Sequence, residues 1–187
     1  MGNLSTHFPA PTSSNVLEQI AYYADGKIVT TGAGNFTAPN ITAITGVTSA
    51  SFIDSPGTNI DYAPPVGTTK VIYEAEILAR YYDDSHISPS WYVELDGTQI
   101  TQTRRTELQQ NTYEMVLHSV AVIYIDGGYS DDIANSKLSS WNSAKTIKTK
   151  ICCHSGSYQF YVNGIHHYAG VASNLVTPPM IKVTAIK

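Results

Sequence analysis

The sequence predicts an all-β protein, an antiparallel β-sandwich, on three observations. Apolar and polar residues alternate with a period of two over most of the chain, most clearly over residues 69–80. Turn residues such as Asp96-Gly97 separate these stretches at the spacing that all-β sandwiches show. The last such stretch, residues 180–186, reaches almost to the end of the sequence, which indicates a strand built into the core of a closed sheet assembly.

The first part of the chain departs from this pattern. Residues 1–14 carry two prolines and few large apolar groups, which favours an extended N-terminal arm. The remaining residues, 15–187, are few enough for one domain and numerous enough to bury a core without metal or disulfide staples. We therefore expect a short arm, residues 1–14, followed by one domain over residues 15–187.

A short helix is expected directly after the arm. Asn15 has the position of an N-cap residue, and Glu18 stands three residues later, as in a capping box. Gly26 is a plausible residue to end the helix. A strand through residues 20–23 is the alternative.

From Lys27 onward, the period of two predicts strands, broken by turns at residues 55–57 and 64–67. Two hairpins are expected, at Asp96-Gly97 and at Asn163-Gly164. Residues 131–143 are expected to form a loop or helical turn pinned by Trp141. The predicted strands cover residues 28–31, 40–53, 59–62, 69–80, 91–95, 99–106, 113–125, 145–154, 157–162 and 180–186.

Composition excludes several classes of protein. The net charge is −4, and Arg104-Arg105 is the only adjacent basic pair. The sequence therefore has no row of basic residues that could follow the phosphates of a nucleic acid. No apolar run approaches the ~18 residues of a membrane span, and the N-terminus has no secretory signal pattern. Cys152 and Cys153 are neighbours on a predicted strand and point to opposite faces, so we expect no disulfide between them. We expect one to be buried in the core and the other to be a free thiol.

No catalytic motif is found. The chain lacks a nucleophile elbow, a phosphate-binding glycine loop, a paired zinc signature and a metalloprotease motif, so we expect no enzyme, no cofactor and no metal. Asp83, Asp84 and His86 are weak cation candidates, and a solvated loop is the alternative interpretation. Glu74 and Glu76 share a strand face, which we interpret as solvent-exposed or as a subunit contact.

Two further features bear on modification and binding. Residues 1–6 fit the N-myristoylation pattern, with Gly2 as the acceptor once Met1 is removed. Aromatic residues that could stack on sugar rings, if exposed, are Trp91, Tyr92, Tyr129 and Trp141. Packing in the core or in a loop is the alternative interpretation for both tryptophans.

Several stretches together resemble a known group of proteins. They are Val16-Leu17-Glu18-Gln19, residues 28–31, Tyr62-Ala63-Pro64-Pro65-Val66-Gly67-Thr68, Lys70-Val71-Ile72-Tyr73-Glu74, residues 158–164 and the C-terminal strand. In these the chain resembles small structural proteins of aquatic double-stranded DNA viruses, such as large algal viruses and cyanophages. Those proteins are similar to C1q/TNF-like single jelly rolls.

This resemblance implies a single jelly roll that serves as a capsid component of the virion, at a penton (vertex) or as a minor capsid protein. The implied partners are copies of the chain in a closed trimer or pentamer, and major capsid or other virion proteins. The implied location is the virion, assembled in the host cell, with membrane contact only if Gly2 is myristoylated. The alternative is a host-attachment or carbohydrate-binding head of a viral fibre, which would bind a host-surface glycan. A C1q/TNF-like secreted ligand is a third possibility, weakened by the missing signal peptide.

Overall fold

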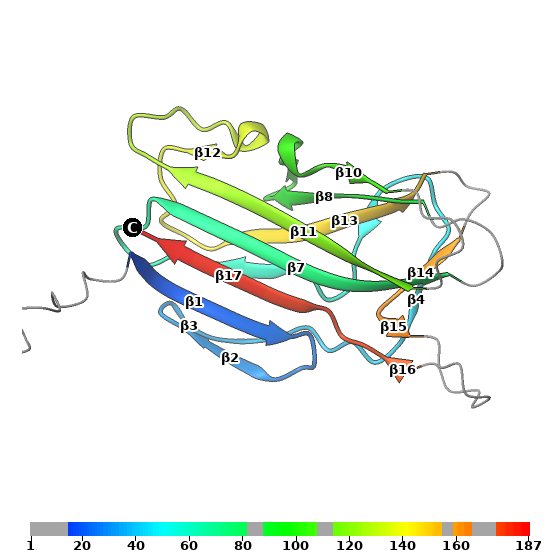
Figure 1. The fold of residues 1–187 in the computed structure, drawn as a ribbon. Helices are drawn as coiled ribbons and strands as arrows, with labels where there is room; N and C mark the ends of the chain where they lie inside the picture. Colours follow the sequence, from blue (N-terminus) through cyan, green and yellow to red (C-terminus); the bar gives the residue numbers. More distant parts are fainter. Residues whose placement is uncertain (1–14, 82–87, 108–113, 155–158, 166–174) are drawn as a thin grey trace, which may run out of the picture.

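Two β-sheets packed face to face make up the protein in a computed structural model that describes residues 15–81, 88–107, 114–154, 159–165 and 175–187. The front layer of Figure 1 contains β1 (Val16–Tyr23), β17 (Met180–Ile186), β7 (Lys70–Tyr81) and β11 (Glu114–Ile125), in that order. β12 (Lys137–Leu138) pairs with the end of β11. β14 (Phe160–Val162) pairs with the end of β7, and β4 (Thr45–Val47) pairs with β14.

The second layer contains β10 (Arg105–Thr106), β8 (Pro89–Leu95) and β13 (Lys145–Cys153), with β5 (Ile53–Asp54) and β6 (Ile60–Tyr62) along the far side of β13. β9 (Thr98–Gln99) pairs with β8 after the Asp96-Gly97 turn, where both residues have positive φ. Smaller elements are the pair β2 (Ile28–Thr31) and β3 (Gly34–Thr37), the pair β15 (Gly164–Ile165) and β16 (Leu175–Val176), and the 3₁₀ turns η2 (Thr101–Thr103) and η3 (Ile133–Asn135).

The strand order is that of a jelly roll. Eight strand positions follow one another along the chain: β1, then β5 with β6, then β7, β8, β10, β11, β13 and β17. The first sheet places the first, eighth, third and sixth side by side, and the second sheet the second, seventh, fourth and fifth. This arrangement of eight antiparallel strands in two sheets is the single jelly roll, so the predicted fold class is confirmed.

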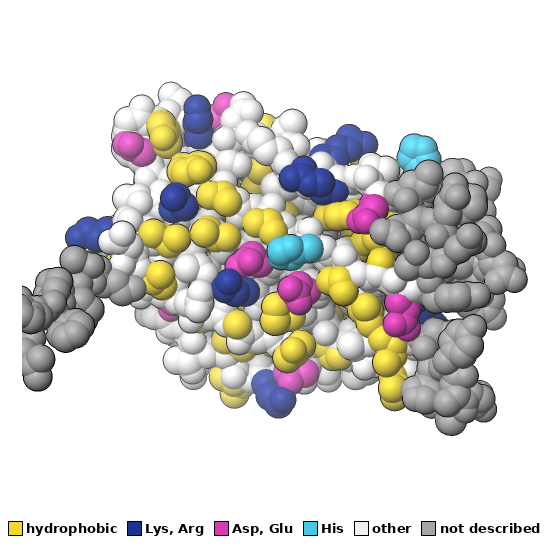
Figure 2. All heavy atoms as spheres, in the orientation of Figure 1, with side chains coloured by type: hydrophobic (Ala, Val, Ile, Leu, Met, Phe, Trp, Pro, Cys, Tyr) yellow, Lys and Arg dark blue, Asp and Glu magenta, His cyan; other side chains and the backbone are white. Residues whose placement is uncertain are grey.

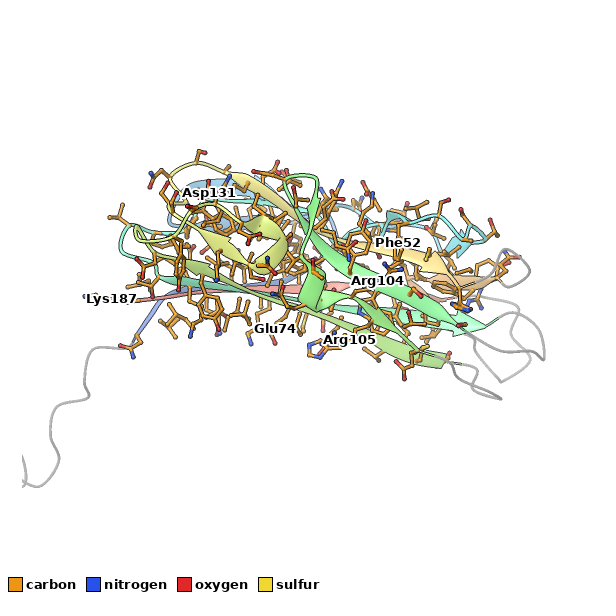
Figure 3. The ribbon with its side chains drawn as sticks, turned by 90° about the horizontal axis from the view of Figure 1, so that it is seen from above. Phe52, Glu74, Arg104, Arg105, Asp131 and Lys187 are labelled. Atoms are coloured by element: carbon orange, nitrogen blue, oxygen red, sulfur yellow. The ribbon has the colours of Figure 1, made fainter. Side chains whose placement is uncertain are left out.

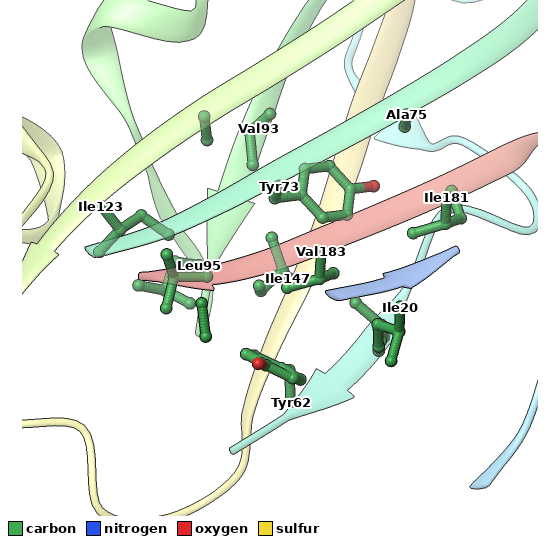
Figure 4. Packing of buried hydrophobic residues seen from close by; sticks show 14 of the residues in the cluster. Ile20, Tyr62, Tyr73, Ala75, Val93, Leu95, Ile123, Ile147, Ile181 and Val183 are labelled. Atoms are coloured by element: carbon green, nitrogen blue, oxygen red, sulfur yellow. The ribbon is translucent and has the colours of Figure 1, made fainter. Parts of the chain in front are cut away.

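The core lies between the two sheets and has two apolar parts. The larger is formed by residues such as Tyr73, Val93, Ile123 and Val183 (Figure 4), and the smaller by residues around Leu117 and Ile151. Because alternate residues of every strand point inward, both sheets contribute to each part.

A buried group of hydroxyls lies where the two parts meet. Ser119 and Thr149 are inward-facing residues of β11 and β13, and the Thr149 hydroxyl donates to Ser119 Oγ over 3.0 Å. The Tyr73 hydroxyl donates to the Thr58 carbonyl over 2.7 Å, and the Thr149 N–H donates to Thr58 Oγ1 over 3.1 Å. Burial raises the pKa of Tyr73, so the phenol stays protonated and able to donate.

The predicted helix after the arm is wrong, because residues 16–23 form β1. This strand pairs with β17 from Val16 to Tyr23, and it buries Ile20 and Tyr22. Glu18 does not cap a helix: its carboxylate accepts hydrogen bonds from the Tyr62 hydroxyl and the Gly32 N–H. Pairing with a distant strand therefore outweighs the local capping signal.

Three other predicted elements are corrected. Residues 40–53 contain only β4 and the start of β5, and residues 99–106 are divided among β9, η2 and β10. The hairpin at Asn163-Gly164 is absent from the described residues, because β14 pairs with β7 and β4 whereas β15 pairs with β16. Asn163 does have a positive φ, of 65°, but it connects β14 of the seven-stranded sheet to β15 of the separate β15–β16 pair.

Candidate interaction surfaces

Apolar side chains lie on the outer face of the seven-stranded sheet, among charged ones. On β11, Met115 and Leu117 point into the core, so Val116 and Val120 point outward, and they are 55% and 38% exposed. The strand register places Leu78 beside Val116 and Ile72 beside Val122. We call this surface the apolar face, and its residues are Ile72, Leu78, Val116, Val120, Val122 and Met180. Figure 2 shows hydrophobic side chains on this side of the molecule, with a small group of charged side chains near its centre.

That central group contains both signs of charge. Lys182 Nζ lies 2.7 Å from Glu74 Oε2, and His118 Nε2 lies 4.0 Å from Glu74 Oε1. The register places Glu76 directly beside His118. Among the residues that the structure describes, no cation lies within ion-pair distance of Glu76, which is exposed. Within the described part of the chain, Glu76 is therefore a carboxylate of this surface without an ion-pair partner.

The outer face of the six-stranded sheet has a different character. Lys148 Nζ lies 3.0 Å from Asp54 Oδ2 and 3.2 Å from Glu94 Oε1. Lys150 Nζ lies 2.7 Å from Asp54 Oδ1 and 4.0 Å from Glu94 Oε2. Hydrogen bonds from Lys150 and Lys148 hold the pKa of Asp54 below its usual range, and the bond to Asp54 raises the pKa of Lys148. The two cations and two anions thus form a closed network within one chain.

Aromatic rings border this network. The rings of Phe52 and Tyr92 have centroids 4.6 Å apart, and the Arg104 guanidinium lies 5.3 Å from the Phe52 centroid. Figure 3 shows Phe52 and Glu74 on opposite sides of the sandwich, so the two outer faces are well separated.

The four predicted sugar-stacking aromatics occupy different environments. Trp91 and Trp141 are each only 5% exposed: Trp91 packs in the smaller part of the core, and the Trp141 Nε1–H donates to the Tyr62 carbonyl over 3.1 Å. Burial leaves neither indole ring a free face for a sugar, which agrees with the packing interpretation. Tyr92 is half-buried beside Phe52, whereas Tyr129 is exposed.

Tyr129 and Trp141 line two adjoining pockets at one end of the sandwich. Their volumes are about 440 Å³ and 400 Å³, and residues 125–127 line both. The structure thus brings two of the four predicted residues to one end, while Trp91 and Tyr92 lie on β8. Sequence reasoning missed Tyr124, whose place in the same pocket as Tyr129 depends on the end of β11.

The other residues that the sequence analysis singled out do not form a site in the described structure. Gly2 and the group Asp83, Asp84 and His86 lie outside the described residues. Within the described ranges, no three His, Cys, Asp or Glu side chains come together as a metal site would require. Cys152 and Cys153 are both free and both buried, and burial raises the pKa of each thiol, for Cys153 to about 11. No described helix is long and apolar enough to cross a membrane.

Comparison with known proteins adds little to this geometry. No family model and no curated protein matches the chain. Among solved structures, it is similar to a chain in the structure of infectious bursal disease virus, Gx strain. The identity is 12% over 86% of this chain and 42% of that chain, and the TM-score is 0.29. It is also similar to the VP2 subviral particle of the same virus (10% identity, 86% of this chain, 38% of that chain, TM-score 0.32). A third is an exo-beta-1,3-galactanase from Phanerochaete chrysosporium, with 8% identity over 90% of this chain and 29% of that chain, and a TM-score of 0.24.

The chain spans less than half the length of these solved chains. At such identities and TM-scores the likeness assigns no function. What its own fold defines is a single jelly-roll β-protein with one apolar and one charged outer face.

Proposed function

We propose that this chain is a structural subunit that assembles with copies of itself, as a single jelly-roll capsid component of the penton (vertex) or minor capsid type. The observation that carries self-assembly is the apolar face. The assignment to a capsid is supported by the strand order, which jelly rolls of viral capsids and lectins share, and by the sequence resemblance.

The apolar face is suited to contact with another sheet. Exposed apolar side chains that gather on one face of a soluble protein mark an interaction site more often than isolated ones do, and here they lie on both sides of the His118–Glu76 row. The valines and Ile72 on β7 and β11 are short and β-branched, so they form a flat surface of the kind that packs against a second sheet about 10 Å away. Burying Val116 and Val120 would each contribute about 1 kcal/mol.

The charges at the centre favour a second copy of this chain as the occupant. Two carboxylates, one lysine and one histidine lie together there, so the surface carries both signs. When one such face meets the same face of a copy, the unpaired Glu76 can lie opposite Lys182 or His118 of that copy. A partner of one charge sign would leave part of this group unmatched.

Sedimentation velocity of the purified chain across a range of concentrations tests the proposal. We expect reversible association of the wild type. The double variant Val116→Lys/Val120→Lys should weaken it about 100-fold, because each copy would bring extra ammonium groups into the contact. Val66→Lys, a change at a fully exposed valine away from this face, is the matched control and should associate as the wild type does.

Thermal unfolding of all three proteins shows whether the substitutions leave the fold intact. A wild-type chain that stays monomeric at the highest concentration would overturn the proposal. So would a folded double variant that associates as tightly as Val66→Lys. Contact between two copies of the same face is two-fold and gives a dimer, so the trimer or pentamer that the sequence resemblance implies needs a second contact between copies. That larger assembly stays a prediction, and the measured mass of the assembly tests it.

A further inference from the structure

The pocket beside Tyr129 has the size of a small-molecule site. It lies where β7 begins and β11 ends, and its volume of about 440 Å³ falls in the ~300–1,000 Å³ range of small-molecule sites. We propose that it binds an acidic saccharide, a sugar carrying a carboxylate or a sulfate. This inference goes beyond the assembly proposal and does not depend on it.

Two tyrosine rings give the pocket its apolar surface. Tyr124 is 44% exposed and Tyr129 is 37% exposed, and both line the pocket. An aromatic ring with a hydroxyl at its edge combines an apolar face with a polar tip. The C–H side of a sugar ring can pack on such a face while its hydroxyls reach the polar groups around it.

The charges around the pocket favour an anion. Lys70 Nζ lies 5.5 Å from the centre of the Tyr124 ring, and Lys137 Nζ lies 5.5 Å from the centre of the Tyr129 ring. Of the described residues that line the pocket, Asp126 is the one with a carboxylate, and the Gly128 N–H donates to its Oδ1 over 2.8 Å. The charged residues of the pocket lining are Lys70 and Asp126, and Lys137 lies beside the lining against the Tyr129 ring. Within the described residues neither lysine is ion-paired, so both ammonium groups can pair with an acidic ligand.

The wall of the pocket is fixed by backbone hydrogen bonds. The Tyr129 N–H donates to the Asp126 carbonyl over 2.8 Å, which closes the turn after β11. The Ile125 N–H donates to the Thr69 carbonyl over 2.8 Å, and the Asp126 N–H donates to the Leu138 carbonyl over 3.0 Å. Because these bonds tie the turn to β12 and to the residue before β7, the backbone that carries the two rings is fixed before a ligand arrives, which lowers the entropic cost of binding.

Titration of the full chain, followed by NMR chemical shifts, tests the site. The probes are sialyllactose and sulfated lactose, with lactose as the neutral match and inorganic sulfate as the anion without a sugar. We expect saturable binding of at least one acidic sugar, and binding about tenfold weaker for lactose and for sulfate alone, which corresponds to one ionic or one stacking contact of ~1.4 kcal/mol.

Variants separate the pocket from the rest of the surface. Tyr129→Ala should weaken the acidic sugar about tenfold, whereas Tyr23→Ala, at an exposed tyrosine on β1, should leave it unchanged. Lys70→Met should reduce the preference for the acidic sugar over lactose. Repeating the titration with the double variant Val116→Lys/Val120→Lys measures sugar binding in a chain whose self-association is weakened. The sugar-site proposal and the assembly proposal can therefore fail independently.

Three results would overturn the inference. One is the absence of binding by either acidic sugar, and another is equal binding of sulfate alone, which would mark a simple anion site. The third is an equal loss in Tyr129→Ala and Tyr23→Ala, which would place the sugar elsewhere.

Discussion

The two outer faces of the sandwich have the same period-two construction but opposite surface chemistry. On β13 and β8, the outward positions hold lysines and a glutamate that pair with one another and with Asp54. On β11 and β7, the outward positions mix apolar and charged residues: Glu74, Glu76 and His118 lie near the middle of the strands, and Lys70, Arg80 and Glu114 lie near their ends. The charged face pairs its groups within one chain, whereas the apolar face leaves apolar side chains that the rest of the described residues do not cover.

This difference separates stability from assembly. Changes on the charged face should alter the free energy of unfolding and leave association unchanged. Changes on the apolar face should do the reverse, because its side chains have few partners within the chain.

The largest expected effect on stability is at Glu94. Its carboxylate is buried and lies near both Lys148 and Lys150, so Glu94→Ala removes charged contacts that water does not replace well. We expect the free energy of unfolding in urea to fall by about 1.5–3 kcal/mol. Glu76→Ala, the same change on the apolar face, should cost less than ~0.5 kcal/mol. Equal losses in the two variants would contradict the distinction between the faces.

A smaller and pH-dependent effect is expected at Asp54. Its pKa is lowered in the folded protein by the bonds from Lys150 and Lys148, so ionised Asp54 adds stability above its unfolded pKa of about 3.9. That contribution is lost as the pH falls through the lower, folded pKa. Because the side chain is 58% exposed, screening limits the loss in Asp54→Asn at about pH 7 to less than ~1 kcal/mol.

Urea unfolding of wild type and Asp54→Asn at several pH values measures this difference. It should be largest near neutral pH and vanish in strong acid. A difference that grows as the pH falls would show that the network has the opposite effect.

The sequence predicts the long strands well, and it fails where the outcome depends on distant partners. Strict alternation in β7 and β11 identifies both strands and their buried faces. In β1, the capping residues Asn15 and Glu18 suggest a helix, but the strand forms because β17, more than 150 residues later, pairs along it. No local pattern contains that information.

For the candidate surfaces too, local patterns place some residues, and the rest depend on distant partners. Trp91 alternates with Val93 and Leu95, and this signal could have placed its ring inside the sandwich. Trp141 lies in a loop without periodicity, so its burial depends on contacts with Tyr62. Glu74, His118 and Lys182 lie on three strands, and only the strand register shows that they form one group.

Hydroxyl-radical footprinting at low and high protein concentration tests the central claim most directly, because it reports on both faces in one sample. We expect oxidation of Met180, Val116 and Val120 to fall as the chain associates, while Tyr92 and Phe52 on the charged face keep their low-concentration rates. Protection of Tyr92 and Phe52, with Val116 and Met180 unchanged, would show that copies meet through the other sheet.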